Sequence, residues 1–171
     1  MMNIHSFAPI EVNNSRILIL GSMPSAESLR KEEYYAHPRN HFWRVMGALF
    51  EFNPTVPYVE RVVMLKAARV SLWDVLQSCT RQGSLDANIE KTSIVTNDFN
   101  SFFERQSIIT HVFFNGSAAE NIYRNKVDPV LVNRQIQYTR LPSTSPAHAS
   151  MSFEKKLAAW RAILLRAAKD D

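Results

Sequence analysis

The chain has 171 residues, of which 46% are hydrophobic, and it carries a formal net charge of +4. This length supports one sizeable core, so we expect a single domain over residues 1–171. The lone Cys79 excludes a disulfide framework and a four-cysteine zinc or iron–sulfur site. Since we see no signal peptide and no long apolar span, we expect a metal-free cytoplasmic protein without membrane contact. The small positive charge suits an anionic partner such as nucleic acid.

Short apolar runs that end in turn residues predict the strands of a mostly parallel sheet. These runs are 16–21, 69–75, 108–114 and 136–141. Apolar residues at helical spacing, or cap residues such as Ser25 and either Asn97 or Asp98, predict helices between and after the strands. The predicted helices are 26–30, 41–50, 58–68, 98–106, 118–125 and 152–168. We interpret residues 1–15 as a lead-in segment on one flank of the sheet, and residues 76–93 as an irregular surface excursion.

Strands that alternate with helices imply an α/β fold, a three-layer α/β/α sandwich around a central, mostly parallel four-stranded sheet. In such folds ligands bind beyond the carboxyl ends of the strands. Those ends bring together residues 21–24, 73–74, 115–117 and 142–146. The loop 34–40, Tyr-Tyr-Ala-His-Pro-Arg-Asn, is expected to lie over them. Its density of aromatic, imidazole, guanidinium and amide groups indicates contact with a flat, partly charged ligand.

At these residues the chain resembles the uracil-DNA glycosylase superfamily, most closely its hypoxanthine-DNA (deoxyinosine) glycosylases. Gly-Ser-Met-Pro at 21–24 occupies the place of the Gly-x-Asn-Pro or Gly-x-Asp-Pro motif. Residues 35–43 resemble the Phe-Ala-His-Pro-x-Asn-x-Phe-Trp stretch of the mismatch-specific branch, and 141–146 are similar to the DNA-gripping His/Asn-Pro-Ser motif. Met23 replaces the residue that orients the attacking water elsewhere, and Leu141 replaces the residue that stabilises the departing base.

The resemblance implies a cofactor-independent enzyme that flips a deaminated base out of DNA and hydrolyses its N-glycosidic bond. In the deoxyinosine branch the catalytic residue is the Asn of the aromatic loop, here Asn40, which aims water with its carbonyl and holds the sugar or base with its amide. Tyr35 is expected to stack on the base. The other predicted base contacts are Gly21, Ser22, Met23, His37, Trp73, Asp74 and Asn115. The predicted DNA contacts, phosphate binding and a wedge, are Arg39, Ser143, Thr144, Ser145, Pro146, Ala147 and His148.

Structural roles also explain several of these residues. Asn40 can cap the following helix, and capping is compatible with catalysis. A hydrogen-bonded structural role is common for a residue such as His37. Tyr35 can cover the sheet edge, Asp74 can be a turn residue, and His148 can be a solvated loop residue.

Other functions stay open at this point. The enzyme could prefer uracil, xanthine or a mismatch, and a DNA-binding relative without catalysis would also fit Met23 and Leu141. A nucleotide-binding doubly wound domain lacks support, because the sequence has no Gly-x-Gly-x-x-Gly or phosphate-loop pattern. We expect a monomer that associates with the nucleoid when bound to DNA, and whose DNA affinity falls steeply with salt.

Overall fold

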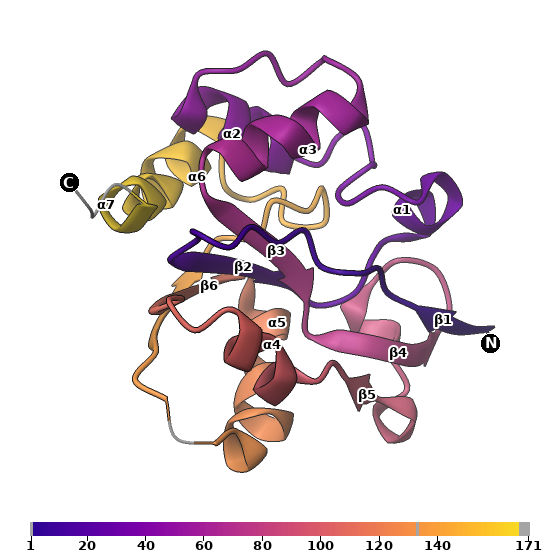
Figure 1. The fold of residues 1–171 in the computed structure, drawn as a ribbon. Helices are drawn as coiled ribbons and strands as arrows, with labels where there is room; N and C mark the ends of the chain where they lie inside the picture. The colour runs from indigo at the N-terminus through magenta and orange to yellow at the C-terminus, as the bar shows by residue number, and fades with distance from the viewer. Residues whose placement is uncertain (1, 133, 168–171) are drawn as a thin grey trace.

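The structure, a computed structural model, describes residues 2–132 and 134–167 (Figure 1). At its centre is a four-stranded sheet with the order β3-β2-β6-β7, in which all neighbouring strands run parallel. The strands are β2 (Ile17–Gly21), β3 (Val70–Asp74), β6 (His111–Asn115) and β7 (Gln137–Leu141). Each overlaps one of the predicted runs, so the predicted parallel sheet is confirmed.

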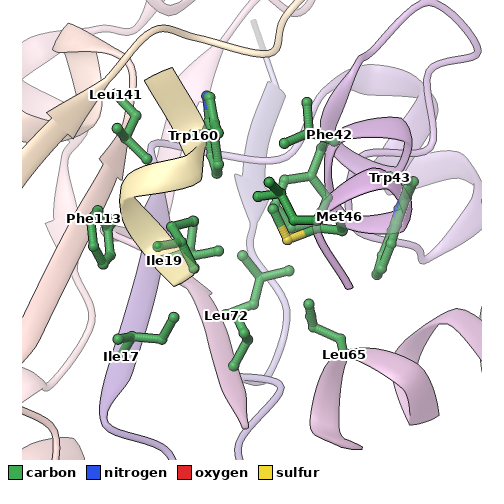
Figure 2. Close-up of a cluster of buried hydrophobic side chains, with 14 of the residues drawn as sticks. Ile17, Ile19, Phe42, Trp43, Met46, Leu65, Leu72, Phe113, Leu141 and Trp160 are labelled. Carbon is green, nitrogen blue, oxygen red and sulfur yellow. The ribbon is translucent and has the colours of Figure 1, made fainter. Parts of the chain in front are cut away.

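Strand β2 shows why both faces of this sheet are covered. All of its residues are buried, and successive side chains point to opposite faces. Ile17 and Ile19 belong to one buried cluster, whereas Leu18 and Leu20 belong to another. Figure 2 shows the first cluster, which contains both isoleucines and Trp160. A central strand that is apolar on both faces requires a layer of helices on each side.

Helices form the two outer layers (Figure 1). On one face lie α2 (Phe42–Phe50), α3 (Tyr58–Ala67), α6 (Phe153–Trp160) and α7 (Leu164–Ala167). On the other face lie α4 (Phe99–Arg105) and α5 (Ser117–Lys126), and the short α1 (Ala26–Lys31) follows β2. Ser25 and Asp98 cap α1 and α4 as predicted. The three-layer α/β/α fold is therefore confirmed. No helix in the described ranges is long and apolar enough to cross a membrane.

A second sheet differs from the sequence analysis. It has the order β1-β4-β5 and is antiparallel, with the strands β1 (Met2–His5), β4 (Leu76–Arg81) and β5 (Val95–Thr96). The prediction that 76–93 is an irregular excursion is wrong for β4. The apolar pattern hides this strand because Ser78 and Arg81, although polar, are buried in it. Its partner β1 lies in the segment interpreted as a lead-in.

Single 3₁₀ turns complete the described elements, and one of them interrupts the predicted C-terminal helix. They are η1 (Asp86–Asn88), η2 (Lys91–Ser93), η3 (Asp128–Val130) and η4 (Arg161–Ile163). The continuous helix predicted over 152–168 is wrong, because η4 separates α6 from α7, and its last residue lies outside the described residues. In a 3₁₀ turn, residues three apart share a face, which lets Trp160 and Ile163 both be fully buried.

Candidate active site

A cavity opens at the carboxyl end of the parallel sheet, where β2, β3 and β6 end at Gly21, Asp74 and Asn115. Its lining comes from these strand ends, from the turn after β2, from the aromatic loop and from the loop after β7. The predicted site residues in the lining are Gly21, Ser22, Met23, Tyr35, Asn40, Asp74, Asn115, Ser143, Thr144 and Ser145. The rule that strand ends converge thus places the cavity where the sequence analysis expected it.

Trp73 does not line this cavity, and its predicted place on the pocket rim is corrected. Its ring packs against Phe99 and Phe102, with centroids 5.2 and 5.1 Å away, and its Nε1–H donates to the carbonyl of Phe7 at 3.1 Å. The reason is strand geometry, since successive side chains of β3 point in opposite directions. Asp74 reaches the cavity, so its neighbour packs into the core.

His37 and Arg39 also lie outside the lining. The Nδ1 of His37 accepts the backbone N–H of Arg39 at 3.1 Å, and its carbonyl accepts the N–H of Asn40 at 2.9 Å. His37 therefore shapes the turn that presents Asn40. Arg39 is exposed.

The end of the loop after β7 leads away from the cavity. Pro146 is half-buried and Ala147 is exposed. His148 lines a neighbouring groove together with Gly116 and Arg140. Roles for these residues in DNA binding stay predictions.

Asn40 combines a structural bond with free polar groups. Its Oδ1 accepts the backbone N–H of Phe42, the first residue of α2, at 2.9 Å. An amide oxygen has a second lone pair, and within the described residues the Nδ2 of Asn40 has no partner. Because Asn40 lines the cavity, these groups can hold a water molecule or a ligand there.

Two buried polar groups beside the floor of the cavity have no partner among the described residues. They are the Oδ2 of Asp74 and the hydroxyl of Tyr35. A Cβ atom at Gly21 would lie 2.6 Å from the Oδ1 of Asp74 and 2.8 Å from that hydroxyl. Only glycine at this position allows both groups to approach the strand end so closely. Buried polar groups are normally satisfied, so this pair is ready to bind a ligand.

The protonation of Asp74 is set by its surroundings. Burial, together with the nearby charge of Asp86, raises the pKa of this carboxyl to about 7, although Arg81 acts against the shift. Burial also raises the pKa of the Tyr35 hydroxyl above its usual value, so this group stays neutral. Asp74 therefore changes between a neutral and a charged form close to neutral pH.

Tyr35 is held in a defined orientation. Its φ of 54° lies in the left-handed region, which is unusual for a residue other than glycine. Its ring stacks on Phe42 at a centroid distance of 4.1 Å and an interplanar angle of 24°. The next backbone N–H, of Ala36, donates to the Oγ of Ser28 at 3.1 Å. Strained conformations of this kind persist where the surrounding structure fixes them, often at functional sites.

A second wall of the cavity, formed by Asn115 and Thr144, has its central groups paired. The Nδ2 of Asn115 donates to the Oγ1 of Thr144, and the backbone N–H of Thr144 donates to the Oδ1 of Asn115, both at 2.9 Å. The carbonyl of Thr144 accepts the N–H of His41 at 3.0 Å. This arrangement keeps Ser143 and Ser145 in the lining. The side chain of Asn115 thus orders the wall, and any contact with a base would use its remaining N–H or lone pair.

The comparisons with known proteins agree with this geometry. The sequence model of the Uracil DNA glycosylase superfamily matches residues 9–168. The chain belongs to this superfamily. The resemblance found in the sequence is thereby confirmed.

Relatives within the superfamily cover nearly the whole chain. A protein from Methanosarcina acetivorans named hypoxanthine DNA glycosylase is 35% identical over 158 residues, 92% of this chain and 95% of the relative. A protein of the same name from Methanosarcina barkeri is 32% identical over 93% of this chain and 96% of its own length. The solution NMR structure of a candidate uracil DNA glycosylase from M. acetivorans matches with a TM-score of 0.77 at 33% identity, covering 95% of this chain and 99% of that one.

The structure also explains the two departures from the superfamily motifs. Met23 is 7% exposed and packs with Leu76 and Cys79, although it also touches the cavity. Its thioether cannot orient water as an amide or a carboxylate does. Leu141 is buried in the main core and does not line the cavity. The remaining polar groups of the cavity must therefore supply the chemistry.

The sequence analysis missed one part of the lining, the loop after β4. Ser84 accepts the N–H of Ala26 at 2.9 Å, and Asp86 accepts the hydroxyl of Ser22 at 2.8 Å. Arg81 donates to the carbonyl of Pro24 at 2.5 Å. These bonds fasten the loop to the turn after β2. In the sequence only its run of polar residues marks this loop. Among the described residues, no His, Cys, Asp and Glu side chains are grouped as metal ligands would be.

Proposed function

We propose that this chain is a monofunctional DNA glycosylase that flips hypoxanthine out of DNA and excises it by hydrolysis, leaving an abasic site. One observation carries the proposal: the unpaired Asp74 carboxyl and Tyr35 hydroxyl lie in a cavity that also contains the amide of Asn40. The relatives named hypoxanthine DNA glycosylase, at 35% and 32% identity, support this choice of base.

Base recognition follows from the chemistry of Asp74. Hypoxanthine presents a carbonyl acceptor, O6, beside a ring donor, N1–H. A neutral carboxyl group has both an O–H donor and an acceptor oxygen and so matches this pair, whereas a carboxylate can only accept. In its neutral form Asp74 can therefore bind the edge of hypoxanthine that carries O6 and N1–H.

Excision follows from positioning. The water that Asn40 holds adds to C1′ as the bond from C1′ to N9 breaks through an oxocarbenium-like sugar. The electron pair of the broken bond stays with the base, and the proton that the water loses neutralises the departing base. Hydrogen bonds from the neutral Asp74 carboxyl stabilise the charge that collects on the leaving base. Tyr35, fixed by Phe42, forms a wall against which the flipped purine stacks. The hydroxyls of Ser143 and Ser145 bind the flanking phosphates.

A panel of oligonucleotides tests this proposal. The purified protein is incubated with matched duplexes that carry deoxyinosine, deoxyuridine, deoxyxanthosine or no lesion, and abasic products are cleaved with alkali. We expect strand breaks at deoxyinosine first and none in the undamaged duplex. Strand breaks only at deoxyuridine or deoxyxanthosine would show that uracil or xanthine, and not hypoxanthine, is the base that the protein excises. Binding without any breaks would indicate a relative that has lost catalysis.

We further propose that the protein acts as a monomer in the cytoplasm and associates with the nucleoid through DNA. The support is that residues of one chain complete the lining of the cavity. Size-exclusion chromatography with light scattering tests this, since a stable dimer would give twice the mass of 19.6 kDa.

A further inference from the structure

A groove beside the cavity has no role in the mechanism so far. It has a volume of about 300 Å³ and lies between the start of α5, the end of β7 and the loop that follows β7. The side chains in its lining that can donate hydrogen bonds are those of Ser117, Arg140, Ser143 and His148. The groove therefore combines a cation with neutral donors, the groups that bind phosphate in proteins.

The groove adjoins the cavity directly, because Ser143 lines both. Two features hold them together. The backbone N–H of Gly116 donates to the carbonyl of Leu141 at 2.9 Å, and a Cβ atom at Gly116 would lie 3.0 Å from the Cβ of Ser143. Gly116 also has a φ of 91°, which favours glycine. A DNA strand with one nucleotide in the cavity can thus lay its next phosphate across Ser143 into the groove.

The cavity and the groove differ in charge. The lining of the cavity includes Asp74 and Asp86 but no Lys or Arg among the described residues. Residues 142–152 of the neighbouring loop contain no Lys or Arg either. The groove, in contrast, has the guanidinium of Arg140 in its lining. Because a polyanion such as DNA gains much of its affinity from protein cations, the groove suits a phosphate better than the cavity does.

The guanidinium of Arg140 is available to a ligand. Its side chain is 57% exposed, and its Nε lies 3.4 Å from the Oε2 of Glu120. An exposed ion pair of this length contributes little free energy, so a phosphate can replace the carboxylate. Glu120 would keep a second arginine, since its Oε1 also lies 4.0 Å from the Nε of Arg124. An arginine can bind a phosphate through two parallel hydrogen bonds.

The neutral donors around Arg140 are placed by the loop after β7. The Oγ of Ser143 accepts the backbone N–H of Ser145 at 3.1 Å, so its own hydroxyl hydrogen can still be donated to a ligand. The backbone N–H of His148 donates to the carbonyl of Ser145 at 3.0 Å, which returns the chain to the groove. Ser117, the first residue of α5, is exposed at the same groove.

We propose that this groove binds the DNA phosphodiester next to the flipped nucleotide, with Arg140 as its cation and the hydroxyls of Ser117 and Ser143 as neutral donors. The inference rests on the proposed function only in taking DNA as the ligand, since a phosphate needs no base in the cavity. Glu120 holds Arg140 in place in the free protein and competes with the phosphate for it.

DNA binding by Arg140→Gln tests this inference. The probe is a duplex that carries a tetrahydrofuran abasic analogue, which cannot be excised, and Kd is measured over a range of salt concentrations. We expect Kd to rise by about tenfold, and the slope of log Kd against log salt to fall by about 0.9, the contribution of one phosphate. The Tm should stay within about 4 °C of the wild type, because only an exposed ion pair is lost.

The matched control for net charge is Arg69→Gln. Arg69 is exposed and directly precedes β3, so it lies at the amino edge of the sheet, opposite the cavity. Since charges separated by more than a Debye length are screened, this variant should change Kd by less than about twofold. Glu120→Gln removes the competitor of the phosphate and should lower Kd by about two- to threefold.

Ser117→Glu separates binding from stability. A carboxylate at this position would repel a phosphate in the groove, so we expect Kd to rise by about fivefold or more. The Tm should equal or exceed that of the wild type, because acidic residues are favourable in the first turn of a helix. Ser117→Gln, which adds similar volume without charge, should stay within about twofold of the wild type in Kd. This pair also provides the test if Arg140→Gln does not fold.

The outcomes distinguish the groove from the proposed function. Unchanged Kd and salt slope in Arg140→Gln would overturn the inference, and so would a lower Tm with an unchanged slope, which would make Arg140 a structural residue. If the wild type excises no base while the slope of Arg140→Gln still falls, the phosphate site stands and the proposed function fails. Normal excision by the wild type with an unchanged slope in the variant would leave the function and remove the site.

Discussion

The two walls of the cavity are built on opposite principles. On the wall of Gly21, Tyr35 and Asp74, buried polar atoms lack partners in the described structure. On the wall of Asn115 and Thr144, two reciprocal hydrogen bonds satisfy the central groups. The first wall, which we call the recognition wall, keeps its hydrogen-bonding groups available for a ligand. The second, which we call the supporting wall, uses its groups to hold a loop.

Asn40 lines the same cavity, and its replacement should give the largest effect. We expect Asn40→Ala to reduce the rate of deoxyinosine excision by about a thousandfold, as loss of a positioning and charge-stabilising group does. Single-turnover assays measure this. Asn40→Ser is the control, because a serine can still accept the N–H of Phe42 but has no amide. Both variants should bind lesion DNA normally, and full turnover by either would remove Asn40 from the mechanism.

The supporting wall should respond mainly in stability. Asn115→Ala leaves the buried N–H and hydroxyl of Thr144 unpaired, so we expect the free energy of unfolding to fall by roughly 2–3 kcal/mol in urea titrations. Thr144→Val breaks only the side-chain bond and should cost roughly 1 kcal/mol. If both variants were as stable as the wild type, the two hydrogen bonds would not hold the wall, and the contrast between the walls would disappear.

The recognition wall should respond to added volume. A methyl group in Gly21→Ala would meet Asp74 and the Tyr35 hydroxyl at less than 3 Å. We expect a loss of about 2 kcal/mol in stability, as is typical of overpacking, together with weaker excision. Tyr35→Phe removes one of the two obstacles, so the double variant should recover part of both losses. Normal stability and activity of Gly21→Ala alone would contradict the close approach.

Proton uptake by Asp74 should make the stability depend on pH. Its pKa, raised from 3.8 to about 7, means that the folded protein holds a proton that the unfolded chain releases within this range. The free energy of unfolding should therefore fall as pH rises from about 4 to about 7, by about 1.4 kcal/mol for each unit of pKa shift at most. Denaturation at several pH values measures this, and Asp74→Asn should flatten the curve.

The same titration should appear in catalysis. If the neutral carboxyl recognises the base, the excision rate should fall above pH 7 by up to about tenfold per pH unit. Asp74→Asn keeps a donor and an acceptor at all pH values, and its rate should lose this alkaline limb. A wild-type rate that stays constant to pH 9 would show that recognition does not use the neutral form.

The elements that can be predicted from the sequence are those marked by a pattern of neighbouring residues. Buried parallel strands appear as apolar runs, and their ends located Gly21, Asp74 and Asn115 at one edge of the sheet. The prediction for Trp73 was wrong because it assigned both residues at the end of the strand to the cavity. Side chains alternate along a strand, so Trp73 and Asp74 point to opposite sides. Alternation is a local rule, so this error could have been avoided.

The loop that carries Ser84 and Asp86 was out of reach of such rules. It depends on β4, which pairs with β1 across more than 70 residues of sequence. Two polar residues of β4, Ser78 and Arg81, are buried in the folded protein, which no local period reveals. The unpaired state of the Asp74 carboxyl likewise depends on its tertiary neighbours and not on its own sequence context.

This long-range pairing gives the first few residues of the chain a remote influence. Strand β1 aligns Met2 with Arg81, the residue whose guanidinium grips the turn at Pro24. A tag or truncation that disrupts β1 would weaken the hydrogen bond from Arg81 to Pro24, although β1 itself lies outside the superfamily motifs described above. Preparations that differ only at their amino end would then differ in how well they hold a flipped base.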